Sequence, residues 1–167
     1  MAVTRPVKQL ALDTNLVLDL AEGADFAHDF RESFQKKGYV LYLPPTTAAE
    51  LHENFQHGET ARKRELAQTA LLKVRSWGLR PLDLADVEES IAERFAGRLL
   101  QAGLLPEEEF NDGLILAETS VKSVPLLVTS DKHLLDLDDD ALVLLFNEAD
   151  LPPVHPVDPR RLLRALR

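Results

Sequence analysis

The sequence lacks several features that mark particular classes of protein. It contains no cysteine, which excludes a disulfide scaffold and thiolate chemistry. It has no apolar run of the ~20 residues needed to cross a bilayer, and no apolar segment of signal-peptide length follows Arg5 and Lys8. Internal repeats and low-complexity stretches are also missing. We therefore expect a cytoplasmic protein with no membrane partner.

The chain also has no overall excess of positive charge. The formal net charge is −9 at pH 7, whereas a general nucleic-acid binder usually has a basic footprint. Basic residues nevertheless gather in two places, at Arg62, Lys63 and Arg64 and at Arg160, Arg161, Arg164 and Arg167. These clusters are either a local basic surface beside an acidic site or ordinary solvated helix faces.

The length of 167 residues predicts a single domain, residues 1–167, with one core. The hydrophobic fraction of 45% and charged fraction of 28% are those of a globular protein. Within this domain we expect a helical elaboration around residues 58–105. We also expect an extended, basic C-terminal tail at residues 151–167, ending in a short helix.

Short apolar runs alternate with helical patterns along the chain. The runs predict strands at residues 9–12, 39–43, 126–129 and 142–146, and an edge strand or extended linker at 79–84. Helices are predicted at residues 15–21, 24–37, 46–57, 60–77, 86–103 and 111–122. Strands alternating with helices predict an α/β protein whose mainly parallel sheet, of four or five strands, is covered on both faces.

Four acidic residues are predicted to meet at one edge of this sheet. Asp13 follows the first strand, and Asp131 follows the strand that ends at Thr129. Glu50 and Asp112 lie in the first turns of helices that run antiparallel to the strands, which places them at the strands' C-terminal edge. Ligands of open α/β sheets bind at this edge.

Carboxylates brought together repel one another unless a cation compensates. Oxygen ligands suit Mg²⁺ or Mn²⁺, and the chain has no cysteine for softer metals. Two such ions ~3.5–4 Å apart can hold a phosphodiester and activate a water molecule for in-line attack. The four acids therefore favour metal-dependent phosphoryl hydrolysis.

Each acid also has a simpler structural explanation when it is taken alone. Asp13 can cap the helix that follows it, and Glu50 can close a capping box with Thr47. Asp112 can merely start a helix, and Asp131 can belong to a polar turn. The shared position at one edge favours a common site over four separate structural roles.

At these residues the chain resembles the PIN-domain nucleases. The resemblance rests on four short motifs in the family's order, between residues 10 and 146: an apolar run ending in Asp13-Thr14-Asn15, then Thr47-Ala-Ala-Glu50-Leu, Asn111-Asp112-Gly-Leu-Ile-Leu-Ala and Leu-Val-Thr129-Ser-Asp131. The family's catalytic and metal-binding acids match Asp13, Glu50, Asp112 and Asp131, and its auxiliary polar residues match Asn15 and Thr129. Asp136 is either an outer acid of the site or part of an acidic loop.

The resemblance implies a compact three-layer α/β/α sandwich and Mg²⁺- or Mn²⁺-dependent cleavage of single-stranded RNA. Many bacterial members of the family are toxins of toxin–antitoxin pairs and form homodimers, which implies an antitoxin partner and a homodimer here. The segment of residues 58–105 is longer than a compact toxin of this kind needs between the second and third motifs. We expect RNA to enter over a basic surface, formed by Arg62, Lys63 and Arg64 or by the C-terminal arginines.

Two other functions remain open from the sequence. A phosphatase of the haloacid-dehalogenase type also opens with an apolar strand ending in Asp, but it needs an acid or threonine two residues later, where this chain has Asn15. A PIN-like interaction scaffold with an idle site is the second, because the chain is acidic overall. Metal binding without hydrolysis would distinguish the scaffold from the nuclease.

Overall fold

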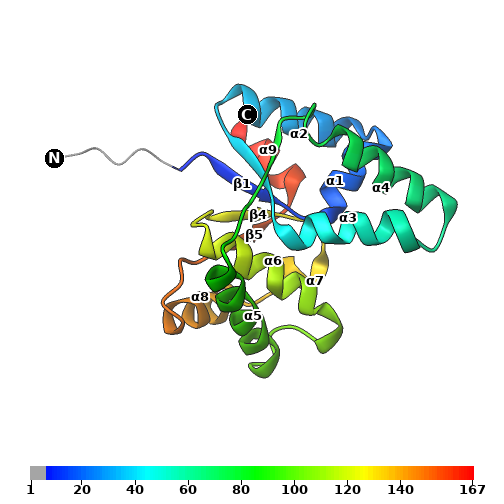
Figure 1. Cartoon of the computed structure of the whole chain (residues 1–167). Coiled ribbons are helices and arrows are strands. Elements are labelled where there is room, and N and C mark those ends of the chain that lie inside the picture. Colours follow the sequence, from blue (N-terminus) through cyan, green and yellow to red (C-terminus); the bar gives the residue numbers. More distant parts are fainter. Residues whose placement is uncertain (1–6) are drawn as a thin grey trace.

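In the computed structural model, which describes residues 7–167, five parallel strands form one sheet (Figure 1). They are β1 (Gln9–Leu12), β2 (Val40–Leu43), β3 (Leu79–Pro81), β4 (Leu126–Val128) and β5 (His155–Val157), in the spatial order β3-β2-β1-β4-β5. The chain builds outward from β1 to β3 and then crosses to β4 on the other side of β1. The topological switch point, where such sheets bind ligands, therefore lies between the C-terminal ends of β1 and β4.

Helices cover both faces of the sheet and complete the predicted three-layer α/β/α sandwich (Figure 1). One face is covered by α1 (Thr14–Glu22), α2 (Asp25–Lys36), α3 (Pro45–His57), α4 (Ala61–Lys73) and α9 (Pro159–Leu166). The other is covered by α5 (Asp86–Gln101), α6 (Phe110–Val121), α7 (Lys132–Leu135) and α8 (Asp139–Glu148), with the 3-10 helix η1 (Glu107–Glu109) leading into α6.

The central strand β1 divides its side chains between the two layers of core. Leu10 and Leu12 pack into the cluster under α1 and α2, and Ala11 packs into the cluster under α5 and α6. All three are fully buried, because successive side chains of a strand point to opposite faces. Burial of each leucine stabilises the fold by about 1.5–3 kcal/mol. This anchoring fixes the next residue, Asp13, at the C-terminal edge of the sheet.

The prediction of a last strand at residues 142–146 is wrong, because these residues lie in α8. Only Leu142 and Phe146, four residues apart, are buried there, whereas Leu144 is 57% exposed. That spacing is one face of a helix. The Asp138 side chain accepts a hydrogen bond from the Ala141 N–H at 3.0 Å and caps the helix. The acidic run before the apolar residues is thus the start of this helix.

The fifth strand comes instead from the segment predicted as an extended tail. β5 pairs with β4, as the Thr129 N–H donates to the Val157 carbonyl at 2.9 Å. Pro156 has no N–H to donate, which is tolerated because β5 is an edge strand. α9 then packs back onto α2 (Figure 1). Residues 151–167 are therefore part of the sandwich and not an extended tail.

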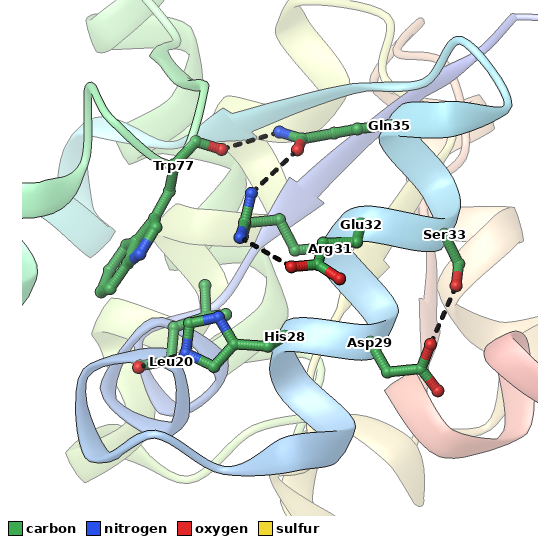
Figure 2. A network of polar contacts seen from close by, with 8 residues as sticks. All are labelled: Leu20, His28, Asp29, Arg31, Glu32, Ser33, Gln35 and Trp77. Atoms are coloured by element: carbon green, nitrogen blue, oxygen red, sulfur yellow. Dashed lines mark hydrogen bonds and ion pairs between the residues drawn. The ribbon is translucent and has the colours of Figure 1, made fainter.

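Polar contacts on α2 fix the turn that leads into β3 (Figure 2). The Gln35 amide donates to the Trp77 carbonyl at 2.8 Å and accepts from the Arg31 guanidinium at 3.2 Å. Gly78 follows with a φ of +73°, and a Cβ there would lie 2.9 Å from the Gln35 amide nitrogen. Glycine adopts this left-handed conformation without the strain that a Cβ would bring. The turn ends the segment after α4 and directs residues 79–81 into the sheet as its other edge strand.

Candidate metal centre

Three of the four predicted acids converge at the switch point. Asp13, Asp112 and Asp131 each offer one carboxylate oxygen, and these oxygens all lie within 4.8 Å of one another. Asp13 follows β1, Asp131 lies at the N-cap of α7 after β4, and Asp112 lies in the first turn of α6. Parallel strands and the antiparallel helices between them bring these positions to one edge, as the sequence predicts.

Asp13 is held in one orientation by hydrogen bonds to both carboxylate oxygens. Oδ1 accepts from the Thr14 N–H at 2.8 Å, which caps α1. Oδ2 accepts from the Thr129 hydroxyl at 2.7 Å and from the Asn15 amide at 3.2 Å. Burial raises the pKa of Asp13 above its usual range, the nearby Asp131 raises it further, and these hydrogen bonds lower it. The capping role proposed for Asp13 and its place in the acid cluster are therefore compatible.

The predicted auxiliary residues Asn15 and Thr129 connect β1 to the loop after β4. The Thr129 hydroxyl accepts from the Asp131 N–H at 3.0 Å while it donates to Asp13. The Asn15 amide oxygen accepts from the Ser130 N–H at 3.2 Å. Thr129 is fully buried. Together the two side chains set the position of Asp13 relative to Asp131.

Asp112 is the acid least satisfied by the protein itself. Its carboxylate is buried, and Oδ2 has no hydrogen-bond partner among the described residues. Burial, with Glu109, Asp13 and Asp131 close by, raises its pKa to about 9. A buried carboxylate oxygen without a hydrogen-bond donor is costly in a folded protein.

Glu50 lies beside the three acids and is linked to them through Thr14. Its Oε1 accepts from the Thr14 hydroxyl at 2.8 Å. Burial raises the pKa of Glu50, and the charges of Asp13, Glu109 and Asp131 raise it further, which places Glu50 within their electrostatic reach. It does not belong to the group of oxygens within 4.8 Å.

The alternative capping box between Thr47 and Glu50 does not form. α3 begins at Pro45, two residues before Thr47, and its N-cap is Pro44. The Thr47 hydroxyl donates instead to the Leu12 carbonyl at 3.0 Å. This bond ties the first turn of α3 to the end of β1 and leaves Glu50 free to face the acids.

Glu109 is an acid that sequence analysis did not single out. It precedes α6, and its side chain contributes to the raised pKa of Asp112 and of Glu50. His133 lies 3.7 Å from its carboxylate. From the sequence, none of the three acids in the run Glu107-Glu-Glu109 could be preferred as a site residue. Glu109 is directed toward Asp112 by the turn of η1 into α6.

The other predicted site residues lie away from the three acids. Asp136 is exposed at the C-cap of α7 and makes no side-chain hydrogen bond or ion pair with the described residues of the cluster. The exposed Arg62, Lys63 and Arg64 begin α4, at the outer end of the α3–α4 hairpin (Figure 1). Arg64 donates to the Gly58 carbonyl at 2.7 Å.

The side chains present at the switch point fit a hard divalent cation. All the candidate ligands are carboxylate oxygens, the donors that Mg²⁺ and Mn²⁺ prefer. Burial and then the repulsion between neighbouring acids raise the pKa values of Asp13 and Asp112, and a cation would compensate both effects. It would also give the unpartnered Asp112 oxygen a ligand role.

Replacing Asp131 by Asn tests whether these acids repel one another in the metal-free protein. Asn is as good an N-cap as Asp, so the Oδ1 bond to the His133 N–H, 2.9 Å long here, can persist. Loss of the negative charge should leave the free energy of unfolding unchanged or raise it by up to about 1 kcal/mol. Thermal melts in EDTA measure this, and a marked loss of stability would assign Asp131 a structural role.

Comparison with solved structures identifies the fold. The chain is similar to a chain in the crystal structure of VapBC2 from Rickettsia felis bound to a DNA fragment from their promoter, with 19% identity, a TM-score of 0.61 and coverage of 90% of this chain and 98% of that chain. It is also similar to a chain of FitAcB from Neisseria gonorrhoeae, with 18% identity, a TM-score of 0.52 and the same coverage of both chains. No family model and no curated protein matches the sequence.

The parallel sandwich with carboxylates at its switch point is an α/β protein built around an acidic edge. The toxin chains of the matching complexes are PIN-domain proteins, so this chain has a PIN-domain fold, as the sequence motifs predict.

Among residues 7–167 no helix is long and apolar enough to span a membrane.

Proposed function

We propose that the protein is a metal-dependent endoribonuclease that hydrolyses phosphodiester bonds of single-stranded RNA. The observation that carries this proposal is the convergence of Asp13, Asp112 and Asp131 within 4.8 Å. The unpartnered oxygen of Asp112 and the PIN-domain fold support it. RNA is proposed as the substrate because the sequence motifs resemble those of the PIN-domain nucleases.

The residues of the proposed site either hold the metal ion or position the residues that hold it. Asp13, Asp112 and Asp131 hold Mg²⁺ or Mn²⁺, and Glu50 contributes directly or through water. The bound ion supplies Lewis-acid stabilisation of the phosphodiester and lowers the pKa of water. Asn15 and Thr129 position Asp13 through the hydrogen bonds described above.

Cleavage of an unstructured RNA by the purified protein tests the proposal. We expect cleavage in Mg²⁺ or Mn²⁺ that is abolished by EDTA. The products should carry a 5′-phosphate and a 3′-hydroxyl, because a water oxygen bonds to phosphorus and the P–O3′ bond breaks. Attack by the ribose 2′-hydroxyl would instead leave a cyclic phosphate. Cleavage that survives EDTA would contradict the proposal. Metal binding without cleavage of any RNA would favour the interaction scaffold.

The path of the RNA is proposed to cross the start of α4. Arg62 and Lys63 are exposed there, whereas Arg160 lies 3.8 Å from the centre of the Phe26 ring and Arg167 pairs with Asp29. Arg62 and Lys63 are therefore exposed to meet phosphate at the start of α4, and Arg161 and Arg164 on α9 are exposed in the same way and form the comparison pair.

Replacing Arg62 and Lys63 by Gln should weaken RNA binding and reduce its salt dependence. The slope of log affinity against log salt should fall by about 0.7 for each phosphate of a single strand that the variant no longer neutralises. Binding is measured across a salt series in the Asp13→Asn background, which prevents cleavage. Arg161→Gln with Arg164→Gln is the matched comparison on α9. If only the α9 pair changes the slope, the RNA path lies at the C-terminal helix.

We also propose an antitoxin partner and a homodimer. VapBC2 and FitAcB, the complexes to which the chain is similar, are toxin–antitoxin complexes. A short reading frame beside the gene, coexpressed with this chain, should yield a complex that copurifies and loses ribonuclease activity. Copurification with unchanged activity would argue against an antitoxin.

A further inference from the structure

Helix α3, which carries Glu50, begins without a cap of its own. Its N-cap residue Pro44 has no side chain that can accept a hydrogen bond, and Pro45 at the first position has no N–H. The first N–H that needs a partner is therefore that of Thr46, which is buried. The first amides of a helix must find acceptors outside the helix.

Glu118 from α6 supplies these acceptors. Its Oε1 accepts from the Thr46 N–H at 3.0 Å, and its Oε2 accepts from the Thr46 hydroxyl at 2.7 Å. Both carboxylate oxygens are thus used on one residue of α3. Glu118 is 6% exposed, and its carboxylate sits at the positive end of the α3 dipole, where negative charge is favoured.

The two helices joined by this contact carry acids of the proposed site. Thr46 and Glu50 are four residues apart on α3 and share one face. Asp112 lies in the first turn of α6, on the same helix as Glu118. Thr46 and Glu50 line a groove of about 500 Å³ together with Asn111 and Leu114 of α6. The position of α3 against α6 therefore sets how far Glu50 lies from Asp112.

We propose that Glu118 is a positioning residue, which clamps α3 to α6 through Thr46 and so fixes Glu50 relative to the other acids. This inference rests on the proposed metal-dependent function. Glu118 has no contact with the three converging carboxylates and acts through the two helices that it joins. Its loss should therefore change metal binding while the sandwich remains folded.

Mn²⁺ affinity, measured by calorimetry at a temperature where each variant is folded, tests the clamp. Residues that orient metal ligands typically change metal affinity 10–100-fold when replaced, so Glu118→Ala should weaken Mn²⁺ binding by about tenfold. Thr46→Val, which keeps the charge of Glu118 and removes one of its two donors, should also weaken binding. If Thr46→Val leaves affinity unchanged, the charge of Glu118 and not positioning is responsible, and the inference is wrong.

Ser120→Ala is the matched control. Ser120 is fully buried on the same helix, but its hydroxyl donates to the Pro152 carbonyl, away from α3. The Ser120→Ala variant should have a lower melting temperature than the wild-type protein and an unchanged Mn²⁺ affinity. If Glu118→Ala behaves in the same way as Ser120→Ala, Glu118 is merely structural and the positioning role is excluded.

A second readout does not depend on metal. Because the chain has no cysteine, spin labels can be placed at Gln56→Cys on α3 and Glu108→Cys before α6, which are both exposed. The interspin distance should shift or broaden in Glu118→Ala but not in Ser120→Ala. An unchanged distance would overturn the clamp even if metal binding is lost. If the wild-type protein binds no Mn²⁺, the proposed metal-dependent function is wrong. The interspin distance would still show whether Glu118 clamps α3 to α6.

Discussion

Replacing Asp112 by Asn is expected to abolish RNA cleavage and yet stabilise the metal-free protein. Asp112 contributes the buried, unpartnered oxygen to the acid cluster. Asn cannot supply the anionic oxygen that would bind the metal, and single groups that stabilise charge in the transition state contribute on the order of 10²–10³-fold in rate. The same change removes a carboxyl that burial and neighbouring acids disfavour in its charged form.

Asp136→Asn is the matched control for this experiment. Asp136 is an exposed acid at the C-cap of α7 and lies outside the converging group. It should retain wild-type cleavage and Mn²⁺ affinity. Rates are measured with the same RNA and saturating Mn²⁺, and stabilities by melts in EDTA. If Asp112→Asn cleaves RNA at the wild-type rate, Asp112 is not part of the site. If Asp136→Asn loses cleavage, Asp136 is an outer acid of the site.

Mn²⁺ affinity is expected to rise steeply with pH. The pKa of Asp112 is raised to about 9 in the folded, metal-free protein, so the carboxyl keeps its proton at neutral pH and must release it to bind metal. Binding that releases one proton strengthens up to about tenfold per pH unit below that pKa. Calorimetry at pH 6, 7 and 8, in buffers of different ionisation enthalpy, measures both the affinity and the released proton.

The same raised pKa predicts how the stability of the metal-free protein depends on pH. The folded state holds the Asp112 proton up to a pKa of about 9, whereas the unfolded state loses it near the ordinary pKa of 3.8. Stability therefore falls as pH rises between these values, by at most about 1.4 kcal/mol per pH unit for one proton. Asp112→Asn should reduce this fall. A Mn²⁺ affinity that is constant from pH 6 to 8 would contradict both expectations.

The sequence predicted the acidic edge because local rules place those residues. Asp13 follows a strand whose burial on both faces is visible as an apolar run, and Asp112 begins a helix antiparallel to the strands. The order of strands was not needed, since all parallel strands share one C-terminal edge. Four motifs in the order of the PIN-domain nucleases then identified the fold.

Residues 139–157 were mispredicted because short apolar runs fit a strand and a buried helix equally well. Leu142–Phe146 was assigned as a strand, although Asp138 caps α8 and directs Phe146 against Phe95, 4.5 Å away between ring centres. β5 was missed because Pro156 argues against a strand everywhere except at a sheet edge.

Glu118 and Glu109 were missed for a different reason. The hydrogen bonds from Thr46 to Glu118 join residues 72 positions apart, and no pattern along the chain links them. A capping box between Thr47 and Glu50 was the alternative that their spacing offered, but α3 starts earlier, at Pro45. Contacts between helices therefore decided what the local motifs left open.

Titration of the metal-stripped protein with Mn²⁺, with site occupancy and RNA cleavage followed on the same samples, tests whether the acid cluster is a metal-dependent nuclease site. We expect cleavage to appear in proportion to occupancy, and Asp13→Asn to lose both metal binding and cleavage. Asp13 is the acid held by hydrogen bonds from Thr14, Asn15 and Thr129 at the switch point, so its carboxylate is the best-defined ligand of the proposed site. Full cleavage before any Mn²⁺ is bound, or unchanged cleavage in Asp13→Asn, would contradict the account.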